Sequence, residues 1–192
     1  MNPELIQFLS NFQMLTKEEV LIIAEHTHVK EFKKGLILLK EGEVCKSCYS
    51  VLKGCVREYI IKDGEEKTTA FFTEGDAIAS FTSSTSKKPS KHFLECTEDS
   101  LLTVSNQDLE SKICKLIPRL ESIIRFEVEK NAGKEHDHLS KFISSSPEER
   151  YLDFQENRPE LFNRIPQHQI ASYLGIKPES LSRIRKRLSL KK

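Results

Sequence analysis

The sequence lacks any apolar run that approaches the ~18 residues of a membrane-spanning helix. Its first residues, Met1 to Glu4, carry no basic segment and no long apolar core, so no secretory signal is expected. These absences predict a soluble, cytoplasmic protein without a membrane partner. Five cysteines is an odd number, and a chain of 192 residues does not need disulfides for stability, so reduced thiols are expected.

The motifs of several enzyme classes are also missing. There is no Gly-rich phosphate loop, no His-Glu metal motif and no Gly-x-Ser-x-Gly elbow. Serine, histidine and aspartate occur in no arrangement that identifies a nucleophile and its base. His136 and His138 are two residues apart and do not share a helix face, so no metal is expected. We therefore predict no enzymatic activity and no catalytic residue.

Net charge is nearly absent, but its distribution along the chain is uneven. The formal net charge is +1, yet residues 1–140 carry a net charge of −4 and residues 141–192 a net charge of +5. The last 16 residues hold seven basic residues and one acidic residue. This asymmetry indicates either an anionic partner for the basic end or a solvated C-terminal tail.

Short β-prone runs alternate with turn signals between residues 33 and 106. Asp63-Gly64 is a direct hairpin signal, and strands at intervals of roughly ten residues predict a small sandwich or barrel. Residues 4–32, in contrast, are expected to form short helices, with Thr16 and Glu19 as a capping box. The expected strands are 36–39, 49–52, 55–61, 67–72, 93–96 and 101–104.

Helical periodicity returns after residue 107. A helix over 118–142 that starts at Pro118 would be ~37 Å long, which suggests a spine shared with a second subunit. Ser146 and Glu149 predict a capped helix start. The serine-rich stretch 76–92 lies between expected strands and is interpreted as a flexible loop or as a small-residue anion-binding turn.

Residues 167–186 have the pattern of a helix-turn-helix. Ala171 is small where the second helix would pass closely, and Gly175 occupies a turn position that often needs a positive φ. Pro166 and Pro178 each fit the first position of a helix. The expected shared core consists of Ile170, Leu174, Ile176, Leu181 and Ile184.

The second helix, from about 178 to 190, should turn polar and basic residues outward, as a DNA recognition helix does. Arg183 could make a bidentate contact to guanine, and the Glu179 carboxylate could accept a hydrogen bond from the cytosine amino group. A helical hairpin that only packs is the alternative, and Lys177 is a poor N-cap. The predicted base contacts are Glu179, Ser182 and Arg183, and the predicted phosphate contacts are Gln167, His168, Lys177, Arg185, Lys186 and Arg187.

The stretch from Ile165 to Lys186, with Leu181-Ser182-Arg183-Ile184 inside it, resembles the helix-turn-helix of the Crp/Fnr superfamily of bacterial transcription regulators. The glycine spacing of residues 35–75 resembles the family's cyclic-nucleotide-binding β-roll. The resemblance implies an α+β fold. Its implied parts are a double-stranded β-helix or jelly-roll effector domain (1–117), a dimerisation helix and hinge (118–145) and a winged helix-turn-helix (146–192), the wing being inferred from the family alone.

In function, the resemblance implies a homodimer joined through helix 118–142 that binds double-stranded DNA and senses an unknown small-molecule effector. RNA polymerase is a further candidate partner. The alternative is a ligand-independent regulator whose β-roll is only a dimerisation scaffold.

The expected effector cassette departs from that of the nucleotide-binding members, which carry a Gly-Glu pair and an Arg-Ser pair. Ala79-Ser80 and Pro89-Ser90 stand in their places, so only the final serine is retained. Proline offers neither charge nor an N–H, and the loss of arginine removes the strongest hydrogen bonds to a cyclic phosphate, so cyclic AMP is not expected. The candidate effector pocket comprises Gly75, Ala79, Ser80, Phe81, Lys88, Pro89 and Ser90.

The cysteine spacing superficially resembles the ligand set of an iron–sulfur sensor, with Cys45, Cys48 and Cys55 close together and Cys114 distant. The cysteines of oxygen-sensing family members precede the β-roll, whereas Cys48 and Cys55 lie within or beside expected strands. Buried, inert thiols are therefore favoured over a cluster. Cys45 is expected to be exposed beside Lys46, where it could act as a redox thiol.

Overall fold

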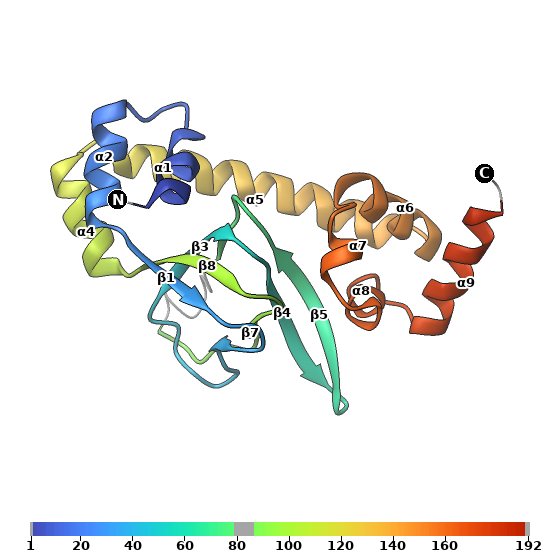
Figure 1. The fold of residues 1–192 in the computed structure, drawn as a ribbon. Helices are drawn as coiled ribbons and strands as arrows, with labels where there is room; N and C mark the ends of the chain where they lie inside the picture. Colours follow the sequence, from blue (N-terminus) through green and yellow to red (C-terminus); the bar gives the residue numbers. More distant parts are fainter. Residues whose placement is uncertain (1, 79–86, 191–192) are drawn as a thin grey trace. The chain divides into compact units, whose positions relative to one another are not determined.

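The protein is seen in a computed structural model that describes residues 2–78 and 87–190 (Figure 1). Ala79, Ser80 and Phe81 of the predicted effector pocket lie outside the described residues. The chain divides into two compact units. One consists of Met1–Glu58 and Phe71–Val128, and the other of Tyr59–Ala70 and Glu129–Lys192.

The strands form two four-stranded sheets within the described residues, with the orders β1-β8-β3-β6 and β2-β7-β4-β5. This architecture, together with the surrounding helices, confirms the predicted α+β fold with a β-roll. The strands are β1 (His28–Phe32), β2 (Ile37–Leu39), β3 (Cys48–Lys53), β4 (Val56–Lys62), β5 (Glu65–Phe72), β6 (Ala77–Ile78), β7 (Phe93–Cys96) and β8 (Ser100–Ser105).

The β-roll interior is an apolar cluster contributed by both sheets. Val51 and Leu102 come from one sheet and Val56 and Leu94 from the other, and all four are almost completely buried. Alternating side chains of a strand point to opposite faces, so one face of each sheet supplies this core. The complete buried cluster is Leu39, Cys45, Val51, Val56, Ile78, Leu94, Cys96 and Leu102.

A second cluster joins the helices of the first unit. It includes Leu5, Val20 and Ile113, and the first turn of the long helix adds Leu120. The predicted capping box at Thr16 is present, since its side chain accepts from the Glu19 amide and Glu19 accepts from the Thr16 amide. The helices are α1 (Pro3–Ser10), α2 (Lys17–His26), α4 (Gln107–Leu116) and the start of α5 (Leu120–Ser144).

The predicted hairpin at Asp63-Gly64 is confirmed. The two residues have φ angles of 55° and 76° and join β4 to β5, as a two-residue turn with both central residues at positive φ requires.

The prediction that residues 28–32 are helical is wrong. They form β1, which pairs antiparallel with β8, so that His28 lies opposite Val104 and Phe32 opposite Ser100. The apolar residues Val29 and Phe32 are three positions apart, which is a helical spacing, so local pattern could not reveal a strand fixed by long-range pairing.

The second unit contains the hairpin segment (Tyr59–Ala70), the later part of α5 and, in the part of the chain that the structure describes, four further helices. The predicted capping box of Ser146 and Glu149 is present at the start of α6. The expected start of the long helix at Pro118 is two residues early, because the Leu120 amide still bonds to the Ile117 carbonyl in a turn. The further helices are α6 (Pro147–Asn157), α7 (Leu161–Arg164), α8 (Gln167–Tyr173) and α9 (Pro178–Ser189).

Gly54 lies where the chain leaves β3, and its site does not admit a side chain. Its φ is +103°, and a Cβ there would lie 2.4 Å from the Ser100 hydroxyl oxygen and 2.7 Å from the Ser100 Cα. Backbone strain and a clash with main chain therefore coincide at this position.

We expect Gly54→Ala to lower the free energy of unfolding by roughly 3 kcal/mol, because strain and overpacking add. Gly42→Ala is the matched control, since Gly42 also has a positive φ but open space around it; it should cost about 1 kcal/mol. Urea denaturation of both variants gives the comparison. Equal losses would contradict the close approach to Ser100.

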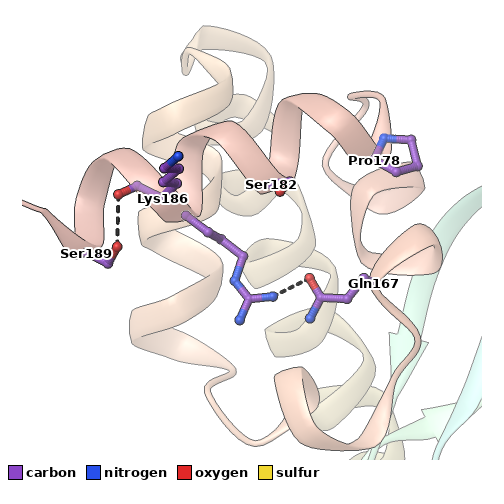
Figure 2. A pocket seen from close by; sticks show the side chains of 6 residues that line it. Gln167, Pro178, Ser182, Lys186 and Ser189 are labelled. Atoms are coloured by element: carbon purple, nitrogen blue, oxygen red, sulfur yellow. Dashed lines mark hydrogen bonds between the residues drawn. The ribbon is translucent and has the colours of Figure 1, made fainter.

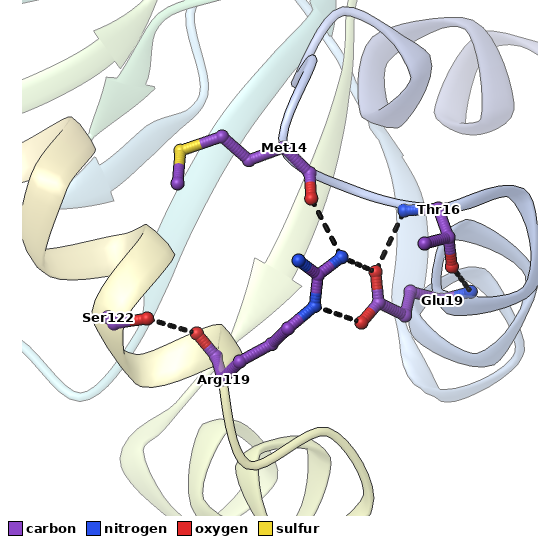
Figure 3. A network of polar contacts seen from close by, with 5 residues as sticks. All are labelled: Met14, Thr16, Glu19, Arg119 and Ser122. Carbon is purple, nitrogen blue, oxygen red and sulfur yellow. Dashed lines mark hydrogen bonds and ion pairs between the residues drawn. The ribbon is translucent and has the colours of Figure 1, made fainter.

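Arg119 ties the turn before α5 to the start of α2 (Figure 3). Its Nε and Nη2 atoms donate to the two Glu19 carboxylate oxygens at 2.6 and 2.5 Å, and Nη2 also donates to the Met14 carbonyl at 2.8 Å. The hydrogen bond from Arg119, with that from the Thr16 amide, lowers the pKa of Glu19 from 4.5 to about 2.

A carboxyl group with a depressed native pKa stabilises the fold above its unfolded pKa and loses that contribution as pH falls. We expect Arg119→Met to lower stability at pH 7 by about 1 kcal/mol and the deficit to disappear as pH falls from 4.5 to about 2. Urea unfolding across this range tests it. Arg125→Met, at an exposed arginine of the same unit, serves as the control and should show no such pH-dependent deficit.

Candidate nucleic-acid interface

The predicted helix-turn-helix is formed by α8, a four-residue connection and α9. Gly175 in the connection has a φ of +70°, as expected from the sequence. Its amide donates to the Ser172 carbonyl, and the Ile176 amide donates to the Ala171 carbonyl, so the connection satisfies the end of α8. Arg150 of α6 adds a bond from its Nη1 atom to the Leu174 carbonyl at 3.1 Å.

The shared core of the two helices is as predicted, apart from one residue. Ile176 is only partly buried. Ala171 is completely buried, which agrees with its expected role at the point where α9 passes closely. The buried members are Ile170, Leu174, Leu181 and Ile184.

The helix starts match the sequence pattern with one shift. Pro178 occupies the first turn of α9, and Lys177 before it makes no side-chain capping bond. Pro166 is the N-cap residue of α8 rather than its first helical residue. The difference is one position, which is the usual uncertainty of helix boundaries.

The outer face of α9 carries the predicted base-contact residues. Glu179, Ser182 and Arg183 are all exposed. In residues 2–78 and 87–190, the side chains of Arg183 and Lys186 form no ion pair. These two cations are therefore available to an external anion.

Two other arginines of α9 are already engaged. Arg187 forms an ion pair with Glu148 in the first turn of α6, and Arg185 donates from Nη1 to Gln167 Oε1 at 2.5 Å. The sequence pattern did not reveal either partner, because 39 and 18 residues separate the members of the two pairs. Only the crossing of the helices brings them together.

A hollow of about 590 Å³ opens between the start of α8 and one face of α9 (Figure 2). Gln167 stands on one side, and Ser182 and Lys186, one helical turn apart, stand on the other. None of the described residues that line the hollow is acidic. Its lining residues are Gln167, Pro178, Ser182, Arg185, Lys186 and Ser189.

An aromatic cluster supports the helix-turn-helix from within the second unit. Tyr173 of α8 lies 5.5 Å from Phe154 of α6 and 6.1 Å from Phe142 of α5, measured between ring centroids. The Tyr173 hydroxyl also bonds to His138 Nε2 at 2.9 Å, and Arg150 lies over the Phe142 ring. These contacts fix α8 against the later part of α5.

The hairpin segment of this unit contacts the same, C-terminal end of α8. The Ser172 hydroxyl accepts from the Thr68 amide at 2.9 Å and donates to the Glu66 carbonyl at 3.0 Å. A single side chain thus satisfies two backbone groups of β5, which is the last strand in its sheet order.

In the described part of the candidate effector pocket, Ser90 stabilises the local backbone through hydrogen bonds. Ser90 is buried, its hydroxyl donates to the His92 carbonyl at 2.9 Å and accepts from the His92 amide, and its carbonyl accepts from the Gly42 amide. Lys88 and Pro89 are exposed, and Gly75 lies in a turn with a φ of +98°. Neither the hollow on α9 nor a second one of about 430 Å³ beside β1 and α4 is lined by these residues.

The expectation that Cys45 is exposed is wrong. Cys45 is buried in the β-roll core, and its thiol lies 3.1 Å from the Ser47 carbonyl. Burial raises the pKa of the Cys48 thiol and raises that of Cys96 to about 11, so both are protonated at neutral pH. The described parts of the chain hold no group of three or more His, Cys, Asp or Glu residues placed to bind a metal ion.

Comparison with known proteins finds one domain family and several similar regulatory proteins. Residues 29–114 match the cyclic nucleotide-binding domain family. The fumarate and nitrate reduction regulatory protein of Yersinia pestis is 25% identical over 167 residues, which cover 81% of this chain and 66% of the relative. The chain therefore spans just under two thirds of the length of such curated relatives.

Solved structures show the same fold at lower identity. The c-di-GMP responsive global regulator CLP of Xanthomonas campestris superposes with a TM-score of 0.70 at 15% identity, covering 92% of this chain and 93% of that one. FixK2 of Bradyrhizobium japonicum has a TM-score of 0.65 at 20% identity, covering 86% and 85%.

No helix within residues 2–78 and 87–190 combines the length and apolarity that crossing a bilayer demands. The domain match over residues 29–114, the sequence similarity to curated regulators and the shared fold all support a place for this chain in the Crp/Fnr superfamily.

Proposed function

We propose that this chain is a homodimeric transcription regulator that reads double-stranded DNA with α9. The observation that carries this proposal is the outer face of that helix, where Glu179, Ser182 and Arg183 are exposed in the second helix of a well-packed helix-turn-helix. Curated relatives are named regulatory proteins, which supports the same function.

The side chains of α9 suit distinct parts of a DNA duplex. Arg183 would donate to the O6 and N7 atoms of guanine, and Glu179 would accept from the cytosine amino group. Ser182 would form a hydrogen bond with the edge of a neighbouring base, as either donor or acceptor. Lys177, Lys186 and His168 would hold phosphates. Arg187 would reach a phosphate only by leaving Glu148, because that carboxylate already neutralises its charge.

Dimerisation would occur through the α5 helix. Leu139 and Ile143 lie one turn apart on this helix and are 56% and 70% exposed. Two such apolar side chains on one face are typical of a helix that packs against a second copy. A two-fold dimer would place its two recognition helices about one DNA turn, ~34 Å, apart.

The effector is unknown, and cyclic AMP is not the candidate we favour. Pro89 stands in place of the family's arginine, and the Ser90 hydroxyl is engaged by His92, so the described cassette residues fit a cyclic phosphate poorly. The apolar cluster that occupies the β-roll interior favours a second candidate, a ligand-independent regulator with a β-roll scaffold.

Native mass spectrometry of protein purified without oxygen should separate these two candidates. We expect a homodimer in either case, because the exposed apolar face of α5 needs a partner. Extra mass on the dimer would identify the class of effector or cluster, whereas bare protein would support the scaffold. A monomer would contradict the proposed dimer and the model of two half-sites.

The Arg183→Ala variant tests the proposed DNA readout. It should lose about 1–3 kcal/mol of binding free energy and relax specificity at a single base pair. The Lys177→Ala variant is the matched control, and it should weaken binding to all sequences alike and lower the salt dependence by about one unit. Selection from random duplexes followed by titration at several salt concentrations gives both quantities. Uniform weakening by Arg183→Ala would show that this residue holds phosphate.

A further inference from the structure

We propose that the hollow between α8 and α9 is a subsite for one DNA phosphodiester group, and that Arg185 is a positioning residue that orients Gln167 toward it. The inference rests on the proposed DNA-binding function and narrows it. It assigns the anion to Gln167, Ser182 and Lys186, and it removes Arg185 from the direct contacts.

The chemistry of the Arg185–Gln167 bond fixes the orientation of the amide. A guanidinium group can only donate hydrogen bonds, so the amide atom 2.5 Å from Arg185 Nη1 must be the oxygen. The Nε2 group of Gln167 therefore points away from Arg185, with its donors free for another acceptor. Figure 2 shows Gln167 held in this way at the edge of the hollow.

The other side of the hollow supplies further donors. Lys186 contributes an ammonium group that has no ion-pair partner in the described chain, and Ser182 contributes a hydroxyl one helical turn earlier. Ser189 already donates its hydroxyl hydrogen to the Lys186 carbonyl. Among the described residues, the hollow thus gathers neutral donors and the positive charges of Lys186 and Arg185, without a carboxylate that would repel an anion.

This set of groups favours a phosphodiester. Lysine, glutamine and serine side chains are typical phosphate contacts in protein–DNA complexes, where such contacts fix the register of the recognition helix. The hollow adjoins the helix whose exposed residues would enter the major groove, so a backbone phosphate beside that groove is the anion within reach. An acidic protein segment is the competing occupant.

The test is a double-mutant cycle with Gln167→Ala and Arg185→Ala. Both side chains are exposed, so neither substitution should prevent folding. The probe is the tightest duplex of about 30 base pairs recovered from a random library, a length that spans two half-sites. Each single change should weaken binding about tenfold, the loss expected for a hydrogen bond to a charged group. In the Gln167→Ala background, Arg185→Ala should then cost less than about twofold.

A second measurement identifies the phosphate itself. Neutral methylphosphonates are substituted one at a time along the duplex. One position should weaken the wild-type protein and leave the Gln167→Ala variant unaffected, a result that a purely structural role for Gln167 would not produce. Arg185→Lys, which keeps a donor but loses the planar fork, should recover part of the affinity.

Three results would overturn the inference. Independent losses, reaching about a hundredfold in the double variant, would show that Arg185 contacts DNA directly. Coupling measured with polyglutamate but not with the duplex would assign the hollow to an acidic protein. Absence of any salt-dependent duplex binding by the wild-type protein would refute the proposed function together with the subsite, which distinguishes that failure from the other two.

Discussion

The close crossing of α8 and α9 is the constraint on which the candidate interface depends. Ala171 has no side chain beyond Cβ, and its complete burial allows α9 to pass near the α8 backbone. Leu181 and Ile184 then bury one side of α9, so the residues between them must face outward. A larger side chain at position 171 would separate the helices and change which residues reach DNA, without altering any of the charged groups.

The same crossing sorts the basic residues of α9 into two classes. Arg185 and Arg187 lie beside groups of α8 and α6 and are engaged by them, whereas Arg183 and Lys186 face solvent. Ion pairs at a surface contribute little to stability, so the significance of these contacts lies in orientation and in the number of free cations. Arg187 is neutralised by Glu148, whereas Arg185 keeps its positive charge because its partner Gln167 is a neutral amide.

The sequence predicted those parts of the fold that local chemistry determines. The capping boxes at Thr16 and Ser146, the Asp63-Gly64 turn and the helix-turn-helix core all depend on residues close together in the chain. The strand β1 was missed because its pairing with β8 joins residues more than 60 positions apart. Pairing between distant residues leaves no local periodicity to detect.

The same distinction between local and long-range contacts applies to the residues of the candidate site. Exposure of Glu179, Ser182 and Arg183 follows from helical periodicity and could be predicted. The partners of Arg185 and Arg187 depend on the helix crossing and could not. The burial of Cys45 was also unpredictable, because a loop residue between two strands gave no indication that it would enter the β-roll core.

Ser90 illustrates why a retained motif residue is weak support for a ligand. It is the one cassette position that matches the nucleotide-binding pattern, yet its hydroxyl closes a local turn with both backbone groups of His92, and its carbonyl binds the Gly42 amide. A buried hydroxyl with these partners is satisfied without any ligand. The fold alone accounts for a serine at this position, so its presence does not favour a nucleotide over another effector or over an unliganded scaffold.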